Sequence, residues 1–335
     1  MKSLQTIQKM IDIVLKTDRR IVLAMIVNVE GSAYRKEGAW MLFQQDGTQF
    51  GVISGGCLEN DLQSRARDLF ETGKAEAVQY DLSAEDDLGW GRGAGCNGIV
   101  SVLIRDIDWD FRQFLSLIQQ QLLDKEPVLF IQSMNMFNDY DGITQNGHRF
   151  GRWKDEVPVK MDATISFQHQ AGQEIIRDKI VYVQLLWPDP SLYIIGAGAD
   201  ARPLARLAHS VGYVVHVLDW RQSLCNDIHF PTALTFQIGD VGKLVETIRY
   251  SPLDSMVIMT HDFQRDMNII QHIRHAPLLY LGILGSKKRT QRLVGVDIPE
   301  WIHSPIGLAI GADGPEEIAV SIVAELIAVR RRKMT

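Results

Sequence analysis

The sequence has few cysteines, no long apolar run and no excess of positive charge, and each shortage excludes a class of protein. Three cysteines in 335 residues do not make a disulfide framework, so reduced thiols in a cytoplasm are expected. The apolar runs stop well short of the roughly 20 residues of a membrane-spanning helix, and the start lacks the apolar core of a secretion signal. A net charge of -6 argues against a nucleic-acid partner, which calls for a basic domain. We therefore expect a cytoplasmic protein that binds neither membrane nor nucleic acid.

The length of the chain predicts two domains, at about 150 residues each. With 46% hydrophobic residues, both domains have enough apolar material for a core. Pro188 and Pro190 stop regular structure and stiffen a linker. The predicted domains are therefore residues 1–187 and 188–335. We see no internal repeat and no low-complexity tract.

Apolar periodicity predicts a mixed α+β fold for the N-terminal domain. Helices are expected over residues 3–17, 58–72 and 109–123, and strands over 20–29, 39–43, 50–53, 75–81, 99–104 and 128–132. Asp46-Gly47 lies between two of these strands and is typical of a hairpin turn. The polar stretch 134–177 is interpreted as hairpins and loops.

The C-terminal domain alternates strands and helices, which predicts a Rossmann-like α/β domain with a doubly wound parallel sheet. Strands are expected over residues 192–195, 214–218, 235–238, 255–260 and 278–283, with helices between them and a last helix over 315–332. Parallel strands of such a sheet end at one common edge, where ligands bind.

A glycine turn follows the first of these strands, with the pattern Gly196-Ala197-Gly198-Ala199-Asp200-Ala201. The first glycine allows a tight turn, the second lets backbone N–H groups approach a phosphate, and the small Ala201 lets helix and strand pack closely. Asp219 ends the next strand at the spacing expected of a carboxylate that contacts a ribose hydroxyl. The alternative is a turn that never meets a phosphate, because fold does not determine ligand.

Three other features follow predicted strands or lie close to the same edge. Lys287, Lys288 and Arg289 would clamp an anion, or would form a solvated helix start. His261 follows the strand 255–260 and would lie at the crevice. For His303 a ligand role and a packing role stay equally open.

The N-terminal domain carries three glycine-rich segments, over residues 31–39, 54–61 and 91–98. Glycines at strand ends commonly make turns only. The last two segments also contain Cys57 and Cys96, and a purely structural glycine cluster does not need a thiol. The alternative for each cysteine is a packing role, because free cysteine is commonly buried.

These segments resemble the XdhC/CoxI family, the accessory proteins of xanthine dehydrogenase and related molybdenum hydroxylases. The motifs that carry the resemblance are Gly31-Ser32 with Arg35, Ser54-Gly55-Gly56-Cys57 with Glu59, Cys96 with Gly98, Gly196–Gly198, Asp219-Trp220-Arg221, Thr260-His261-Asp262, Gly285-Ser286-Lys287-Lys288, and His303-Ser304-Pro305 running to Gly311. Two positions depart from the family pattern: Tyr34 replaces a proline, and Asn97 replaces the glycine that follows the cysteine.

The resemblance implies a chaperone without turnover that binds the molybdenum cofactor (molybdopterin). It would support sulfuration of the cofactor with a cysteine desulfurase and deliver it to an apo molybdenum hydroxylase, and a homodimer is expected. The cofactor-binding residues that it implies are Arg35, Cys57, Cys96, Gly196, Gly198, Asp219, Arg221, His261, Ser286, Lys287, Lys288 and His303. Among them Cys96 is the candidate molybdenum ligand, because molybdenum is bound by soft sulfur.

Two other functions stay open at this stage. An NAD(P)-dependent oxidoreductase is supported by the glycine turn and Asp219, with His261 as the candidate acid–base residue. A redox-regulated binding module would use Cys57 and Cys96.

Overall fold

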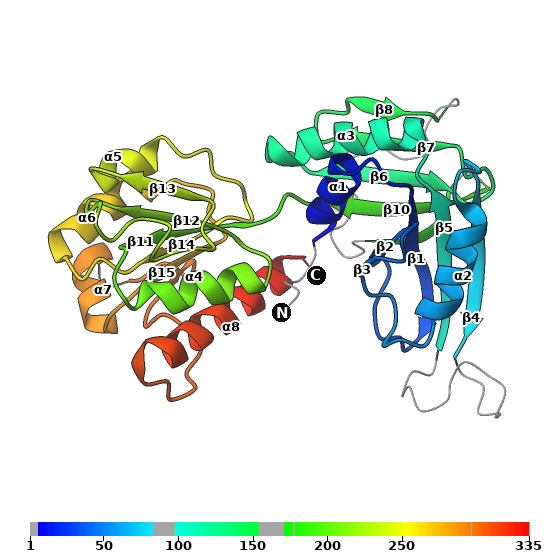
Figure 1. Cartoon of the computed structure of the whole chain (residues 1–335). Coiled ribbons are helices and arrows are strands. Elements are labelled where there is room, and N and C mark those ends of the chain that lie inside the picture. Colours follow the sequence, from blue (N-terminus) through cyan, green and yellow to red (C-terminus); the bar gives the residue numbers. More distant parts are fainter. Residues whose placement is uncertain (1–5, 83–97, 154–170, 177, 296, 335) are drawn as a thin grey trace. The chain divides into compact units, whose positions relative to one another are not determined.

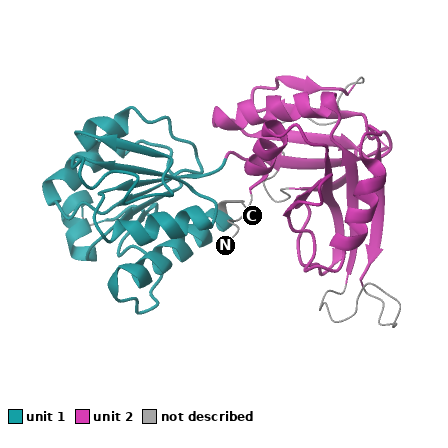
Figure 2. Ribbon diagram, viewed as in Figure 1, with its two compact units in different colours: residues 1–4, 189–334 teal, residues 5–188, 335 magenta. Residues whose placement is uncertain are grey.

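The fold is described from a computed structural model of the chain, which describes residues 6–82, 98–153, 171–176, 178–295 and 297–334. The chain divides into two compact units, one over residues 5–188 and the other over 189–334 (Figure 2). Within the described residues, no helix has both the length and the apolar character needed to cross a membrane.

The N-terminal unit contains two antiparallel sheets that repeat one topology (Figure 1). The first sheet, in the order β3-β2-β1-β5-β4, is built from β1 (Ile21–Gly31), β2 (Trp40–Gln44), β3 (Gln49–Gly51), β4 (Ala75–Asp81) and β5 (Gly98–Asp106). The second, in the order β8-β7-β6-β10-β9, is built from β6 (Val128–Ser133), β7 (Tyr140–Thr144), β8 (Arg149–Gly151), β9 (Ala171–Ile176) and β10 (Lys179–Leu186). The helices are α1 (Ile7–Lys16), α2 (Glu59–Leu69) and α3 (Trp109–Leu123). The expectation of no internal repeat is therefore wrong at the level of structure.

The repeat is visible in the sequence only at its hairpins. Gly47 turns the chain between β2 and β3 with φ 87°, and Gly147 turns it between β7 and β8 with φ 77°. Glycine adopts this left-handed backbone without steric cost. Both hairpins also end in Phe-Gly, at Phe50-Gly51 and at Phe150-Gly151, but so short a match is not revealed by composition or periodicity.

One apolar core joins the two sheets, and equivalent residues of the two repeats stabilise it in different ways. Trp40, at the start of β2, donates a hydrogen bond from its indole to Gln184 of β10 at 2.9 Å. At the equivalent start of β7, the Tyr140 ring lies 4.9 Å from the guanidinium of Arg105 in β5. The first sheet packs its other face on α2 through a second core.

The C-terminal unit is a six-stranded parallel sheet in the order β13-β12-β11-β14-β15-β16. Its strands are β11 (Ser191–Ile195), β12 (Val214–Asp219), β13 (Thr235–Ile238), β14 (Ser255–Ile258), β15 (Tyr280–Ile283) and β16 (Ile302–His303). Its helices are α4 (Ala201–Ser210), α5 (Val241–Glu246), α6 (Phe263–Ile273), α7 (Lys287–Val294) and α8 (Gly314–Met334). Side chains of α4 and α8 share one core and those of α5 and α6 share another, so helices cover both faces of the sheet. The predicted doubly wound, Rossmann-like fold is confirmed.

The strand order reverses at β11, because the chain runs to β12 and β13 on one side and to β14, β15 and β16 on the other. Ligands of doubly wound sheets bind at the carboxyl ends of the strands beside such a reversal. The fold therefore predicts that a ligand would contact the segments that follow β11, β12, β13 and β14.

Candidate functional site

The glycine turn follows β11 at the strand reversal. Gly196 has φ 108°, and a Cβ placed on it would lie 2.6 Å from the carbonyl oxygen of Met259, so only glycine fits. Within the described part of the chain, the N–H groups of Gly198, Ala199 and Asp200 donate no hydrogen bond. Free N–H groups at the start of a helix, here α4, attract an anion. The turn therefore has the donors that a phosphate needs.

Asp219 holds this turn in place. Its carboxylate is fully buried and accepts hydrogen bonds from the Ala197 N–H at 2.6 Å and from the Arg221 guanidinium at 2.7 and 2.9 Å. Burial raises the pKa of Asp219, but the hydrogen bonds from Arg221 and Ala197 outweigh it and lower the pKa below its ordinary value. A carboxylate has about four lone-pair sites, so a ribose hydroxyl would share the oxygens with these donors. A ribose contact at Asp219 stays a prediction.

The side chains of Asp200 and His261 lie in contact next to the glycine turn. His261 Nε2 lies 2.9 Å from Asp200 Oδ2, and the backbone of His261 is left-handed, with φ 57°. A Cβ on Gly198 would lie 2.4 Å from Asp200 Oδ1, the end of a flexible side chain. Asp200 adds negative charge beside the free N–H groups, and a protonated His261 would offset it when an anion binds.

The basic segment after β15 divides into two parts. Ser286 caps α7 by accepting the Arg289 N–H at 3.3 Å. The Arg289 guanidinium forms an ion pair at 2.7 Å with Asp266, a carboxylate that is 2% exposed. The side chains of Lys287 and Lys288 are exposed and have no ion pair within the described residues. Of residues 287–289, Lys287 and Lys288, the α7 lysines, are thus the two whose charges are available to an anion.

His303 belongs to a hydrogen-bonded network under the last helix. Its Nδ1 lies 3.0 Å from Glu325 Oε1, and its ring stacks on Tyr280 with the centroids 4.2 Å apart. Glu325 also accepts the Tyr280 hydroxyl at 2.6 Å and the Gly307 N–H at 2.8 Å. Burial raises the pKa of Glu325, but the hydrogen bonds from His303, Tyr280 and Gly307 outweigh it and lower the pKa. This geometry favours the packing role for His303.

In the N-terminal unit, the described parts of the first and third glycine-rich segments lie side by side. The antiparallel register pairs Gly31 at the end of β1 with Gly98 at the start of β5, whereas Gly51 at the end of β3 pairs with Met41, which pairs with Ala24 of β1. A Cβ on Gly98 would lie 2.4 Å from the Glu30 carbonyl oxygen and 2.8 Å from the Ser32 nitrogen, so the first and third segments touch. Arg35 is exposed in the turn between β1 and β2. Cys96 lies outside the described residues.

The second segment forms the SGGC loop, residues 54–57, whose shape is held by Ser54 and Glu59. The Glu59 carboxylate accepts the N–H groups of Ser54 at 2.7 Å and Gly56 at 3.0 Å, as well as the Ser54 hydroxyl. Burial raises the pKa of Glu59, but hydrogen bonds from Ser54 and from the backbone of Ile53 outweigh it and lower the pKa. Cys57 is half-buried at the end of this loop. The loop is therefore organised before anything binds.

Gly55 of the SGGC loop has no structural reason to be glycine. A Cβ there would meet no atom within 4 Å, and its φ is not in the left-handed range. Its neighbour Gly56 differs, because a φ of 114° requires glycine. Packing within the described residues therefore does not call for a bare backbone at Gly55, and the same holds for Gly172 of β9.

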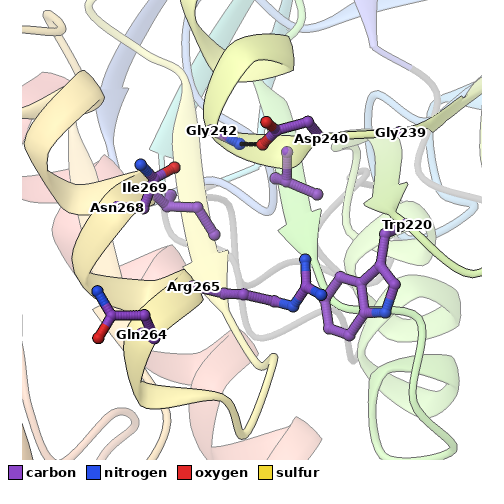
Figure 3. A pocket seen from close by; sticks show the side chains of 9 residues that line it. Trp220, Gly239, Asp240, Gly242, Gln264, Arg265, Asn268 and Ile269 are labelled. Atoms are coloured by element: carbon purple, nitrogen blue, oxygen red, sulfur yellow. Dashed lines mark hydrogen bonds between the residues drawn. The ribbon is translucent and has the colours of Figure 1, made fainter.

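A cavity of about 530 Å³, which sequence reasoning missed, opens in the Rossmann unit (Figure 3). It is lined by Trp220, Gly239, Asp240, Val241, Gly242, Gln264, Arg265, Asn268 and Ile269. The Arg265 guanidinium lies 4.0 Å from the centre of the Trp220 ring. The one signal in the sequence is a tryptophan that directly follows Asp219, at the end of a strand. No group of three metal-ligating side chains occurs among the described residues.

The fold and the candidate sites together define a class of protein with two units. One is a duplicated antiparallel unit whose SGGC loop carries a half-buried thiol, and the other is a Rossmann-type unit. Family models match along most of the chain: the XdhC and CoxI family over residues 14–81, the BH1974-like central domain over 110–187, and the XdhC Rossmann domain over 192–326. The chain belongs to the XdhC/CoxI family.

Relatives match the chain over nearly its whole length. A probable xanthine dehydrogenase subunit of Bacillus subtilis is 40% identical over 324 residues, which is 96% of this chain and 97% of the relative. The molybdenum cofactor insertion chaperone PaoD of Escherichia coli is 24% identical over 324 residues, covering 94% of this chain and 85% of PaoD. A crystal structure described as a xanthine dehydrogenase of Bacillus halodurans superposes with a TM-score of 0.87 at 39% identity, covering 98% of this chain and 96% of that one.

Proposed function

We propose that this chain is an accessory factor that binds the molybdenum cofactor, holds it during sulfuration and delivers it to an apo molybdenum hydroxylase such as xanthine dehydrogenase. The similarity to the insertion chaperone of Escherichia coli and to the xanthine dehydrogenase relative of Bacillus subtilis supports this function. The observation that carries it is the SGGC loop, in which Ser54 and Glu59 hold a half-buried thiol beside a glycine that the fold does not require.

Each of the two units, taken by itself, offers groups that suit one part of the cofactor. Its pterin carries a phosphate, which suits the free N–H groups of the glycine turn together with the α7 lysines. Its molybdenum takes soft sulfur ligands, which suits the thiolate of Cys57. We extend this role to Cys96 from the family motif, and Arg35, which is exposed in the turn between β1 and β2, would interact with an anionic group of the cofactor or of a partner.

The partners follow from this chemistry. Sulfuration needs a sulfur donor, and a cysteine desulfurase would supply it at the exposed edge that carries the SGGC loop. Delivery needs the apo-hydroxylase to reach the same edge. A homodimer is part of the proposal and is tested by the mass of the protein in solution.

An NAD(P)-dependent oxidoreductase is the second candidate. It is favoured by the pair of His261 and Asp200, a candidate acid–base couple 2.9 Å apart beside the glycine turn. Titration with NADH and NADPH separates the two functions, because the chaperone needs neither. Hydride transfer to or from a nicotinamide, abolished by His261→Ala, would establish the oxidoreductase instead.

The test of the chaperone uses Gly55→Ala with Gly172→Ala as the matched control. Both glycines have open space where a Cβ would be added and no left-handed φ, so both variants should fold and match the wild-type stability within about 0.5 kcal/mol. Pterin retained through purification and activation of an apo-hydroxylase are measured for each. We expect Gly55→Ala to lose both and Gly172→Ala to keep both. Equal retention and activation by the two variants would contradict a role for the SGGC loop.

A further inference from the structure

We infer that the cavity at Trp220 binds a planar nitrogen heterocycle with an amino-pyrimidinone edge, the edge that guanine and pterins share, while the phosphate of the same ligand lies on the glycine turn. This inference rests on the proposed cofactor function for the kind of ligand. The cavity of about 530 Å³ lies within the range of roughly 300–1,000 Å³ that is typical of small-molecule sites.

The buried Asp219 connects the glycine turn to the residues that line the cavity. Asp219 accepts the Ala197 N–H of the turn with its carboxylate at 2.6 Å and the Gly239 N–H with its carbonyl oxygen at 3.2 Å. Trp220, the next residue, and Gly239 both line the cavity. A ligand that places a phosphate on the turn therefore has the cavity beside it, along the carboxyl edge of β12 and β13.

Trp220 and Arg265 provide a stacking surface. The Arg265 guanidinium lies 4.0 Å from the centre of the half-buried Trp220 ring, and Figure 3 shows it reaching from α6 to the indole. The Arg221 guanidinium lies 4.6 Å from the same ring centre. Indole rings and planar guanidinium groups are the surfaces on which heterocyclic bases stack. The cavity thus suits a flat aromatic ring better than an aliphatic group.

Asp240 supplies the recognition of the ring edge. One oxygen of its carboxylate accepts the Gly242 N–H at 3.2 Å, and the other has no hydrogen bond within the described residues. Asn268 occupies the space above Gly242, where a Cβ would lie 1.8 Å from its Oδ1. A carboxylate accepts a pair of parallel N–H donors well. Guanine and pterins present such a pair, whereas adenine and uracil do not.

The experiment measures the affinity of guanosine monophosphate and of a fluorescent pterin phosphate, with adenosine and uridine monophosphates for comparison. The test variants are Asp240→Asn and Trp220→Leu. Asparagine also caps a helix, so Asp240→Asn keeps the bond to Gly242 and the fold. Asp108→Asn is the matched control, since Asp108 caps α3 in the other unit by accepting the Phe111 N–H at 2.8 Å.

We expect the wild type to prefer the guanine and pterin phosphates. Asp240→Asn should weaken both by about tenfold or more, because it replaces a charge-assisted acceptor by a neutral one. Trp220→Leu should weaken all four ligands, and Asp108→Asn none. Tighter binding of the pterin phosphate than of guanosine monophosphate would assign the cavity to the pterin itself, and the reverse order would assign it to the base of a nucleotide.

The outcomes keep this inference separate from the proposed function. Cofactor retention that survives both Asp240→Asn and Trp220→Leu would overturn the inference and leave the chaperone function standing. Binding of guanosine monophosphate that these variants abolish, in a protein that never retains the cofactor, would support the cavity and overturn the chaperone function. If neither guanosine monophosphate nor the pterin phosphate binds the wild type, the inference is overturned. Cofactor retention would then test the chaperone function independently.

Discussion

The two glycines of the turn after β11 should respond to substitution in opposite ways. Gly196→Ala combines a left-handed φ of 108° with a Cβ 2.6 Å from the carbonyl oxygen of Met259. The backbone strain costs about 1–3 kcal/mol and the overpacking about 1–3 kcal/mol more, so we expect the free energy of unfolding to fall by about 2–6 kcal/mol. Gly198→Val meets only the movable end of Asp200 and should cost less than about 1 kcal/mol.

Ligand binding, unlike stability, should be impaired by the substitution at Gly198. Gly198→Val places a branched side chain where a phosphate would approach the free N–H groups, so affinity for a pterin phosphate should fall although the fold persists. Because the chain has two units, hydrogen exchange of the β11 amides is the measure of stability for the Rossmann unit. Wild-type exchange in Gly196→Ala would refute the steric reasoning, and wild-type affinity in Gly198→Val would show that no phosphate binds at the turn.

Three further results are expected. In a Cys96→Ser background, iodoacetamide should modify Cys57 in the native protein and spare Cys225. Cys225 is 1% exposed, and burial raises the pKa of its thiol to about 11. Equal modification of the two cysteines, measured by mass spectrometry, would contradict this expectation. The free energy of unfolding should fall as pH drops below 4.5, the ordinary pKa of a glutamate, because Glu325 has a folded pKa below that value and its stabilisation, present at higher pH, is lost as it is protonated. Glu325→Gln should flatten this decline, and an unchanged pH profile would exclude the carboxylate as its source. Replacing both α7 lysines by alanine should weaken binding of a pterin phosphate and reduce the dependence of this binding on salt, because exposed charges attract an anion through screened interactions. The free energy of unfolding should stay unchanged. An unaltered salt dependence would show that the two lysines form a solvated helix start and do not bind the anion.

Local patterns determined much of the fold. The alternation of strands and helices after Pro190 predicted the parallel sheet, and Asp46-Gly47 predicted the first hairpin. Helix boundaries were less accurate: the helix expected over 58–72 runs from Glu59 to Leu69. β10 was not predicted, and the duplication escaped notice, because sheets that share a strand order need not share side chains.

The sequence by itself determined the motifs, because glycine turns, capping residues and cysteines depend on spacing along the chain. Only the tertiary structure decided which motifs contact one another and which charged side chains already have an ion-pair partner. Antiparallel pairing brings segments far apart in the chain side by side, where Gly98 touches Ser32. Arg289 looked available for an anion, but a buried carboxylate from a different helix takes it. The cavity at Trp220 is likewise made by three separate segments, and contacts between distant segments are set by packing rather than by spacing along the chain.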